Sequence, residues 1–234
     1  MNKKQIKRNS VLAVLFFLPV TFLLFLFPAK HNYNPLDILN ENVFELNNFT
    51  SDSDSDIILN NHITVLGFLG SNPEEKIVMS SNINELAYKK FKGFKTFQIV
   101  IVVPNSAKDA AQRLRMELSK YDVLKYWHFV FAEEQYIKLF YSSLITTEPL
   151  DDNLATNHIF IIDRELNQRG RIDDRTENEI DKDSPIYNMP SYDSDKVAVL
   201  KNKMSEDMRV LFTEYREKRK GNFDSDIKKA NDIK

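Results

Sequence analysis

The sequence predicts a three-layer α/β fold with a mixed, mostly parallel sheet, preceded by one N-terminal transmembrane helix. Its 234 residues are 42% hydrophobic and 28% charged, a balance typical of one globular domain with an anchor or a tail. From residue 57 onward, strand-like apolar runs alternate with helical periods, which favours a parallel sheet joined by right-handed crossovers. A separate apolar run precedes this pattern.

Residues 10–28 are expected to cross a membrane, because they form an uncharged apolar run of about 19 residues, close to the roughly 20 that span a bilayer as a helix. Basic residues in the segment 1–9 place that segment in the cytoplasm and the following chain outside it. A cleaved signal peptide is the alternative, but its apolar region is shorter, and Phe27, two residues before Ala29, gives a poor cleavage site.

Abundant Asn, Ile and Lys are typical of an AT-rich bacterial genome. We therefore expect a single-pass protein of a bacterial inner membrane, with a cytoplasmic N-terminus and a periplasmic C-terminal domain.

The composition excludes several classes of function. A formal charge of −2 argues against a nucleic-acid binder, which needs surplus Lys and Arg to displace counterions from phosphates. The absence of cysteine excludes disulfides, thiol catalysis and thiolate metal sites. The sequence contains no serine hydrolase, zinc protease or Walker motif. We expect a protein that is not an enzyme and that holds no cofactor.

The segment 29–56 is rich in Asn, Asp and Ser and is predicted to be a linker, with an apolar patch around Val43, Phe44 and Leu46 that donates a strand. Apolar periodicity predicts the elements that follow. They are strand 63–69, helix 83–91, strand 97–103, helix 107–118, strand 127–131, helix 133–144, strand 158–163 and its hairpin partner 168–172.

The end of the domain is predicted to be a loop followed by one long helix. The segment 173–195 is acidic and contains proline. An apolar stripe at helical spacing then runs from Val197 to Tyr215, as in a helix that packs on a core. The predicted domain covers residues 57–220, and residues 221–234 form a polar tail.

The order of these elements resembles the Sco/SenC family of membrane-anchored proteins. The resemblance covers about residues 57–175 and is carried by the strands FQIVIVV and WHFVFA and by the strand and hairpin HIFIIDRELNQRGRID. It implies a thioredoxin-like fold. It also implies a role in copper handling for cytochrome oxidase assembly.

The copper motif of the resembled family is C-P-x-x-C-P after the first core strand, with a His before a later strand. This chain has Asn72 and Lys76 at the two cysteine positions, Pro73 at the first proline and Ala155 at the His position. Cu(I) prefers thiolate ligands, and thiol exchange needs a thiolate. The resemblance therefore implies a fold that has lost its copper and redox site.

We interpret the chain as a non-enzymatic, membrane-anchored, extracytoplasmic binding protein or assembly factor for an envelope or respiratory complex, without a bound metal. Its partner is expected to be a protein, because the α/β pattern is intact around a site that lacks the cysteines and the His of the resembled family. The expected contact residues lie in the loop after the first core strand and in the acidic loop, where aromatic and Met side chains are plausible anchors. They are Pro73, Glu74, Tyr187, Met189 and Tyr192.

Two alternatives remain open. A copper carrier for cytochrome oxidase assembly would use His or Met ligands instead of cysteine. The candidates are His62, His128, His158, Met79, Met204 and Met208. Ordinary packing or hydrogen bonding is the competing interpretation for each of them. A thioredoxin-fold enzyme is the other alternative, and the missing cysteine counts against it.

Overall fold

A computed structural model of the chain describes residues 3–26, 35–53 and 56–221. These residues belong to two compact units, 1–34 and 35–234, which are described separately. Of the predicted polar tail, residues 222–234 lie outside the described residues.

The first unit contains the helix α1, Lys3–Leu26. Its stretch Gln5–Leu24 has a mean hydropathy of 1.5 and is long and apolar enough to cross a membrane. Pro19 lies inside the helix without ending it. Thr21 Oγ1 donates a 2.7 Å hydrogen bond to the carbonyl of Phe17, four residues earlier, as Ser and Thr side chains in helices often do.

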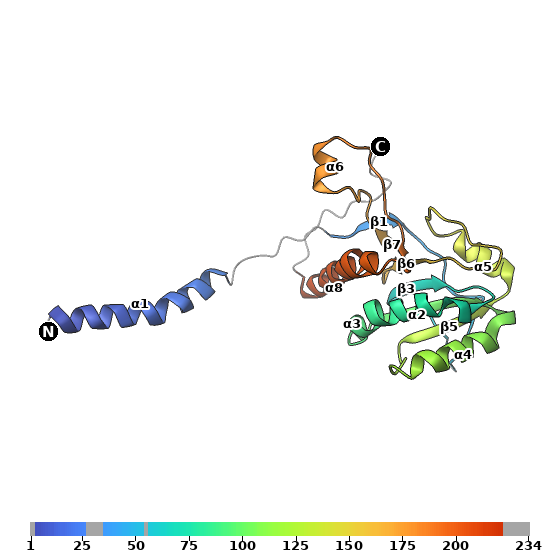
Figure 1. Cartoon of the computed structure of the whole chain (residues 1–234), viewed down its shortest axis with the longest axis horizontal. Coiled ribbons are helices and arrows are strands. Elements are labelled where there is room, and N and C mark those ends of the chain that lie inside the picture. Colours follow the sequence, from blue (N-terminus) through green and yellow to red (C-terminus); the bar gives the residue numbers. More distant parts are fainter. Residues whose placement is uncertain (1–2, 27–34, 54–55, 222–234) are drawn as a thin grey trace. The chain divides into compact units, whose positions relative to one another are not determined.

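The second unit is built on one sheet, which has eight strands within the described residues (Figure 1). Their order is β1-β7-β6-β3-β4-β5-β2, with β8 beside β6. The strands are β1 (Asp37–Asn40), β2 (Thr50–Ser51), β3 (Ile63–Phe68), β4 (Phe97–Pro104), β5 (Trp127–Ala132), β6 (His158–Ile162), β7 (Gln168–Gly170) and β8 (Tyr192–Asp193). β3 and β4 are buried along their whole lengths, as expected for central strands covered on both faces.

The sheet is mixed, and the prediction that it is mostly parallel is wrong. In the described part of the chain only β3 with β4 and β4 with β5 pair in parallel, whereas β1, β2, β6, β7 and β8 pair antiparallel. Apolar periodicity reports burial and not strand direction, so the sequence could not show this. The predicted hairpin is confirmed by β6 and β7. The β3-α2-β4 unit, this hairpin and the closing helix α8 follow the predicted thioredoxin-like order.

Helices cover both faces of the sheet and complete three layers (Figure 1). One face carries α2, α3, α4 and α8, and the other carries α5. In the described residues of this unit the helical elements are η1 (Pro73–Lys76), α2 (Ile77–Ile83), η2 (Asn84–Tyr88), α3 (Lys89–Phe91), η3 (Asn105–Ala107), α4 (Lys108–Ser119), α5 (Glu134–Tyr141), α6 (Glu177–Asp181), α7 (Val197–Val199), η4 (Leu200–Met204) and α8 (Ser205–Lys220). The stripe predicted for 197–215 is confirmed, since Met204, Met208 and Leu211 are buried.

The segment predicted as a linker, 29–56, belongs to the domain from Pro35 onward. It starts at one edge of the sheet as β1 and ends at the other as β2. The expected strand around Val43, Phe44 and Leu46 is not formed, because this part crosses the sheet as a loop with Val43 and Leu46 buried on the α5 face. The segment therefore pairs with the outer side of β7 through β1 and with that of β5 through β2, so that the sheet ends in two short strands.

Arg169 of β7 is fully buried and joins four parts of the domain. Its guanidinium lies 2.9 Å from Asp163 Oδ2 and 2.5 Å from Glu214 Oε2 on α8, and it donates a 2.6 Å hydrogen bond to the carbonyl of Leu36. Burial acts to lower the pKa of Arg169, but the two carboxylates outweigh it and raise that pKa. The cluster fixes α8 and the first residues of the domain to the β6–β7 hairpin.

We expect Arg169→Met to lower the free energy of unfolding by about 3 to 5 kcal/mol, because it leaves the buried carboxylates of Asp163 and Glu214 without their cation. Lys138→Met is the matched control, since it breaks the exposed ion pair with Glu134 and should cost less than about 1 kcal/mol. Urea unfolding of the full chain in detergent, followed by the fluorescence of its one buried tryptophan, measures both losses. Equal losses would contradict a central role for Arg169.

Candidate functional site

The loop that follows β3 is held against the turn that precedes β6. Leu69 forms an isolated antiparallel bridge with Ala155. Gly70 has a φ of +66°, and a Cβ at this position would lie 2.2 Å from the carbonyl oxygen of Asn153, so only glycine allows this approach. The fold therefore brings Ala155 beside the loop 71–76.

Lys76 joins the loop after β3 to the turn before β6 through a series of hydrogen bonds. Its ammonium donates to Asn157 Oδ1 at 2.7 Å, and the Asn157 amide donates to Asp195 Oδ2, also at 2.7 Å. The backbone carbonyl of Asn157 accepts from Ser194, through N at 2.9 Å and Oγ at 2.5 Å. Lys76 and Asn157 are half-buried, and Asp195 is exposed. We call these four residues, together with Ala155, the Lys76 junction.

The residues before Lys76 begin the short 3₁₀ helix η1. Asn72 is exposed and makes no side-chain capping bond. Glu74 forms a bidentate ion pair with Arg113 of α4, at 2.8 and 2.9 Å, and these hydrogen bonds hold the pKa of Glu74 below its ordinary value. Pro73 is buried as the first residue of η1. The expectation that it contacts a partner is therefore corrected, while Glu74 remains accessible.

The chemistry of the Lys76 junction is restricted to hydrogen bonding and charge. An ammonium, a carboxamide and a carboxylate can orient a polar group of a partner. They offer no thiolate for exchange and no soft ligand for Cu(I). The positive charge of Lys76 also repels a metal cation.

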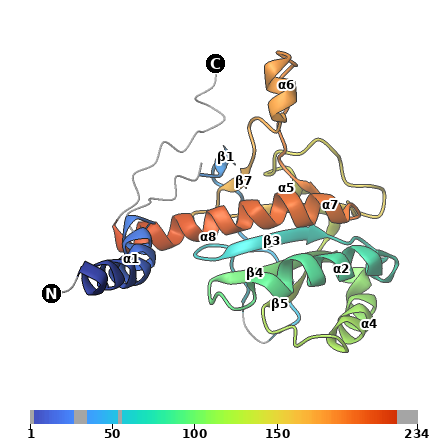
Figure 2. The same cartoon turned by 60° about the vertical axis from the view of Figure 1, so that its left-hand side comes forward.

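The segment predicted as an acidic loop, 173–195, contains α6 and β8. We call residues 173–190 the arm, and α6 at its tip stands away from the sheet (Figure 2). An antiparallel bridge between Arg171 and Met189 joins its two legs. The expectation of a plain loop is therefore corrected, because local polar contacts, which leave no apolar period in the sequence, order this segment.

Polar contacts inside the arm hold its shape. Thr176 and Glu179 form a capping box at the start of α6. The hydroxyl of Tyr187 donates to the Glu179 carboxylate at 3.1 Å, and Arg175 Nη1 donates to the carbonyl of Ser184 at 2.7 Å. Three large apolar side chains of the arm stay exposed, namely Ile180 of α6 at 51%, Ile186 at 62% and Tyr187 at 44%.

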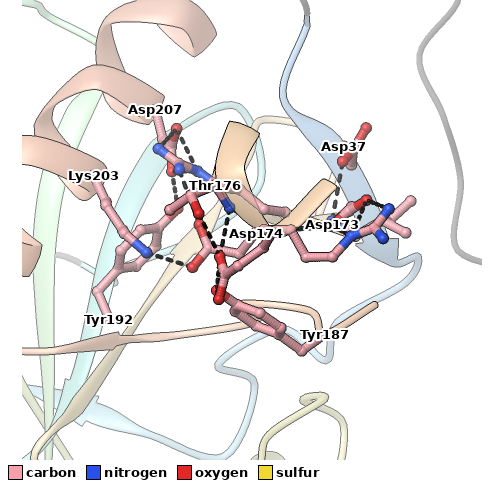
Figure 3. Close-up of polar contacts among 12 residues, drawn as sticks. Asp37, Asp173, Asp174, Thr176, Tyr187, Tyr192, Lys203 and Asp207 are labelled. Carbon is pink, nitrogen blue, oxygen red and sulfur yellow. Dashed lines mark hydrogen bonds and ion pairs between the residues drawn. The ribbon is translucent and has the colours of Figure 1, made fainter. Parts of the chain in front are cut away.

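A charged cluster anchors the base of the arm to α8 (Figure 3). Arg171 lies 2.9 Å from Asp207 Oδ1 and 3.0 Å from Asp174 Oδ1, and Lys203 pairs with the other oxygen of Asp174. Tyr192 donates its hydroxyl proton to Asp207 Oδ2 at 2.7 Å. Burial raises the pKa of Asp207 although Arg171 opposes this. Burial, reinforced by Asp207, raises the pKa of Tyr192 well above its ordinary value, so the phenol remains a donor.

The three expected contact residues of the acidic loop have different surroundings. Tyr192 is fully buried, so the expectation that it contacts a partner is corrected: its ring and hydroxyl are used inside the domain. Met189 is half-buried and packs against the core. Tyr187 is exposed. The sequence could not separate these residues, because an aromatic in a polar segment fits either an anchor to the core or a contact at the surface.

One polar hollow, between α4 and the β2 edge of the sheet, was not expected from the sequence. Its volume is about 450 Å³, and its polar lining is Ser51, Asp52, Lys108, Asp109, Gln112 and Arg115. Arg115 lies 2.6 Å from Asp52 Oδ2 and donates a 2.9 Å hydrogen bond to the carbonyl of Trp127. The opposite charges at its centre are therefore already paired within the domain.

The three alternative His ligands do not come together as one group in the described residues. His62 precedes β3 and His158 begins β6, and because these strands are antiparallel, the two residues lie at opposite ends of them. His128 lies inside β5. Within residues 3–26, 35–53 and 56–221, no group of three His, Asp or Glu side chains could hold a metal ion. The three candidate methionines are buried in the core: Met79, Met204 and Met208.

Comparison with solved structures finds Sco proteins, a domain of a thiol-disulfide oxidoreductase and a peroxiredoxin. BsSco, a member of the Sco family of cytochrome c oxidase assembly proteins, has 15% identity and a TM-score of 0.44, with 58% of this chain and 86% of that chain covered. Copper-bound ScoI from Arabidopsis thaliana has 15% identity and a TM-score of 0.38, over 71% of this chain and 96% of that chain. The mitochondrial 2-Cys peroxiredoxin from Plasmodium falciparum has 12% identity and a TM-score of 0.43, over 80% and 99%. Two of these three structures are of Sco proteins, the family that the sequence resembles.

A scan of protein-family models finds no match to the chain, and a search of curated proteins finds none.

The half-buried position of His128 in β5 predicts a pH dependence of stability. Burial lowers its pKa below the ordinary value of 6.5, so the unfolded chain takes up a proton at higher pH than the folded chain does. The free energy of unfolding should therefore fall as the pH drops through 6.5, until the folded chain is protonated as well. Urea unfolding of the native chain and of His128→Gln between pH 8 and pH 5 measures this contribution as the difference between two profiles. Parallel profiles would contradict it.

Proposed function

We propose that this chain is a membrane-anchored, non-enzymatic thioredoxin-like protein that binds another protein outside the cytoplasm and supports the assembly of an envelope or respiratory complex. The observation that carries this proposal is the Lys76 junction. An ordered domain surrounds a site at which Lys76 and Asn157 join two loops by a hydrogen bond, and the chain has no thiolate to place there, since it lacks cysteine. Its resemblance to Sco proteins implies the assembly role.

The anchor in this proposal is α1, and its support is the apolar stretch Gln5–Leu24. Lys7 and Arg8 precede the uncharged run from Ser10 onward, which favours an N-terminus in the cytoplasm. The domain then lies on the periplasmic side of a bacterial inner membrane.

The arm is the proposed contact surface, together with Glu74. Ile186 and Tyr187 present apolar area on the segment that returns from α6, as in the few large side chains that dominate many interfaces. The capping box of α6 and the cluster around Arg171 hold the arm in one shape, which reduces the entropy that binding would otherwise cost. Six carboxylates and two cations between residues 173 and 190 favour a partner with a basic rim around an apolar pocket.

Single cysteines test both the orientation and the contact surface, because the native chain has none. Ile186→Cys lies on the arm and Leu139→Cys on α5, where the native side chains are 62% and 53% exposed. In intact spheroplasts, a membrane-impermeant maleimide that carries a photoreactive group should label both variants. Illumination should then give a discrete protein adduct with Ile186→Cys and none with Leu139→Cys.

Each part of this proposal can fail separately. If neither cysteine is labelled until the membrane is permeabilised, the proposed orientation is contradicted. If both are labelled but Ile186→Cys gives no adduct of its own, the arm is not the contact surface.

A further inference from the structure

The C-terminal end of α8 and the loop before β4 form a basic surface, which we call the basic end. Its members are Lys95, Arg216, Lys218, Arg219 and Lys220, all exposed. Two carboxylates belong to the same surface, those of Glu217 and of Glu165, which accepts a hydrogen bond from Tyr215. The basic end therefore has a net charge of +3 in a chain whose formal charge is −2.

An aromatic stack joins the two parts of the basic end. Phe94 stacks on Phe212 of α8 with ring centroids 4.1 Å apart, and it remains 38% exposed. Arg216 and Lys220 follow Phe212 by four and eight residues, so they lie on the same face of the helix. Basic side chains in a last helical turn also stabilise the helix, but that role does not account for an exposed Phe94 with Lys95 beside it.

The basic end lies next to the first residues of the domain. Arg169 donates hydrogen bonds both to the Leu36 carbonyl and to Glu214, and Lys218 pairs with Glu214 at 2.8 Å. From Glu214 to Lys220 the helix rises only about 9 Å. Leu36, near the start of the domain, therefore lies beside Glu214, within about two turns of α8 from these cations.

The length of the tether keeps this part of the domain near the membrane that α1 is proposed to cross. α1 ends at Leu26, and eight residues, 27–34, separate it from Pro35. A chain of this length spans at most about 28 Å. The cations of the basic end therefore stay within reach of the lipid headgroups on the side where the domain lies.

We infer that the basic end binds anionic phospholipid headgroups of the same membrane and thereby orients the domain. This inference rests on the proposed anchoring by α1. Each Lys or Arg near an anionic surface strengthens binding by about five-fold, and the partial negative charge of about half a unit at the end of α8 is small beside +3. The arm, with a net charge of −4, is repelled by the same surface. Figure 2 shows α6 and the C-terminal end of α8 far apart, so this orientation leaves the tip of the arm exposed to a partner.

Energy transfer to labelled headgroups tests this inference in the full-length chain, reconstituted in vesicles of phosphatidylcholine with or without phosphatidylglycerol. Gly93→Cys carries one donor beside the basic end, where a Cβ meets nothing within 4 Å, and Ile180→Cys carries one on the arm. Transfer from residue 93 should increase with phosphatidylglycerol and fall back in high salt. Transfer from residue 180 should not increase.

The variant Arg216→Gln/Arg219→Gln/Lys220→Gln should reduce the ratio of docked to undocked chains by roughly 100-fold. Lys218 is kept because it pairs with the buried Glu214. The control Lys108→Gln/Lys120→Gln/Lys138→Gln removes the same charge from exposed positions on and around α4 and α5, and it should dock like the native chain.

Two results would overturn the inference. One is equal transfer from residue 93 on both kinds of vesicle, and the other is unchanged docking of the variant at the basic end, which would assign these cations to a protein partner or to the helix alone. Extraction of the chain from both kinds of vesicle by alkaline carbonate would instead contradict the anchoring in the proposed function, and the docking with it.

Discussion

A single buried cation, Arg169, holds the parts of the second unit in register. It neutralises two fully buried carboxylates, those of Asp163 and Glu214, and donates to the carbonyl of Leu36. Buried ion clusters add little net stability over apolar packing of the same volume, yet the loss of one member is costly. The cluster therefore fixes the β6–β7 hairpin, α8 and the first residues of the domain relative to one another.

Arg171, two residues after Arg169, also joins the end of the β6–β7 hairpin to α8 by an ion pair. Side chains two apart on a strand face the same side, so both arginines reach α8, at Glu214 and, two turns earlier, at Asp207. Gly170 between them faces the other way, where a Cβ would lie 2.6 Å from neighbouring atoms. The R-G-R sequence thus positions both proposed surfaces, because Arg171 anchors the base of the arm to α8 and Arg169 pairs with Glu214, just before the basic end.

The sequence was informative wherever burial follows a regular period. The central strands could be predicted because they are nearly continuous apolar runs, and the long C-terminal helix because its apolar side chains repeat every three to four residues. β1, β2 and α6 could not be predicted, since they are short and depend on edge pairing or on a capping box. At the site, the sequence alone could identify Lys76, because this residue stands at the second cysteine position of the resembled family's motif. Its partner Asn157 could not be identified in this way, because 81 residues separate the two and only the folded sheet brings them together.

The proposed function rests on the proposal that a domain without cysteine holds no metal at the Lys76 junction, where a hydrogen bond joins two loops. An anaerobic titration with Cu(I), in competition with a chromophoric chelator of micromolar affinity, tests this most directly in the full-length chain in detergent. The native chain should take no copper from the chelator, whereas Asn72→Cys/Lys76→Cys, which restores two thiolates to the loop, should take up copper. Stoichiometric uptake by the native chain would contradict the loss of metal chemistry and favour a carrier that uses His or Met ligands.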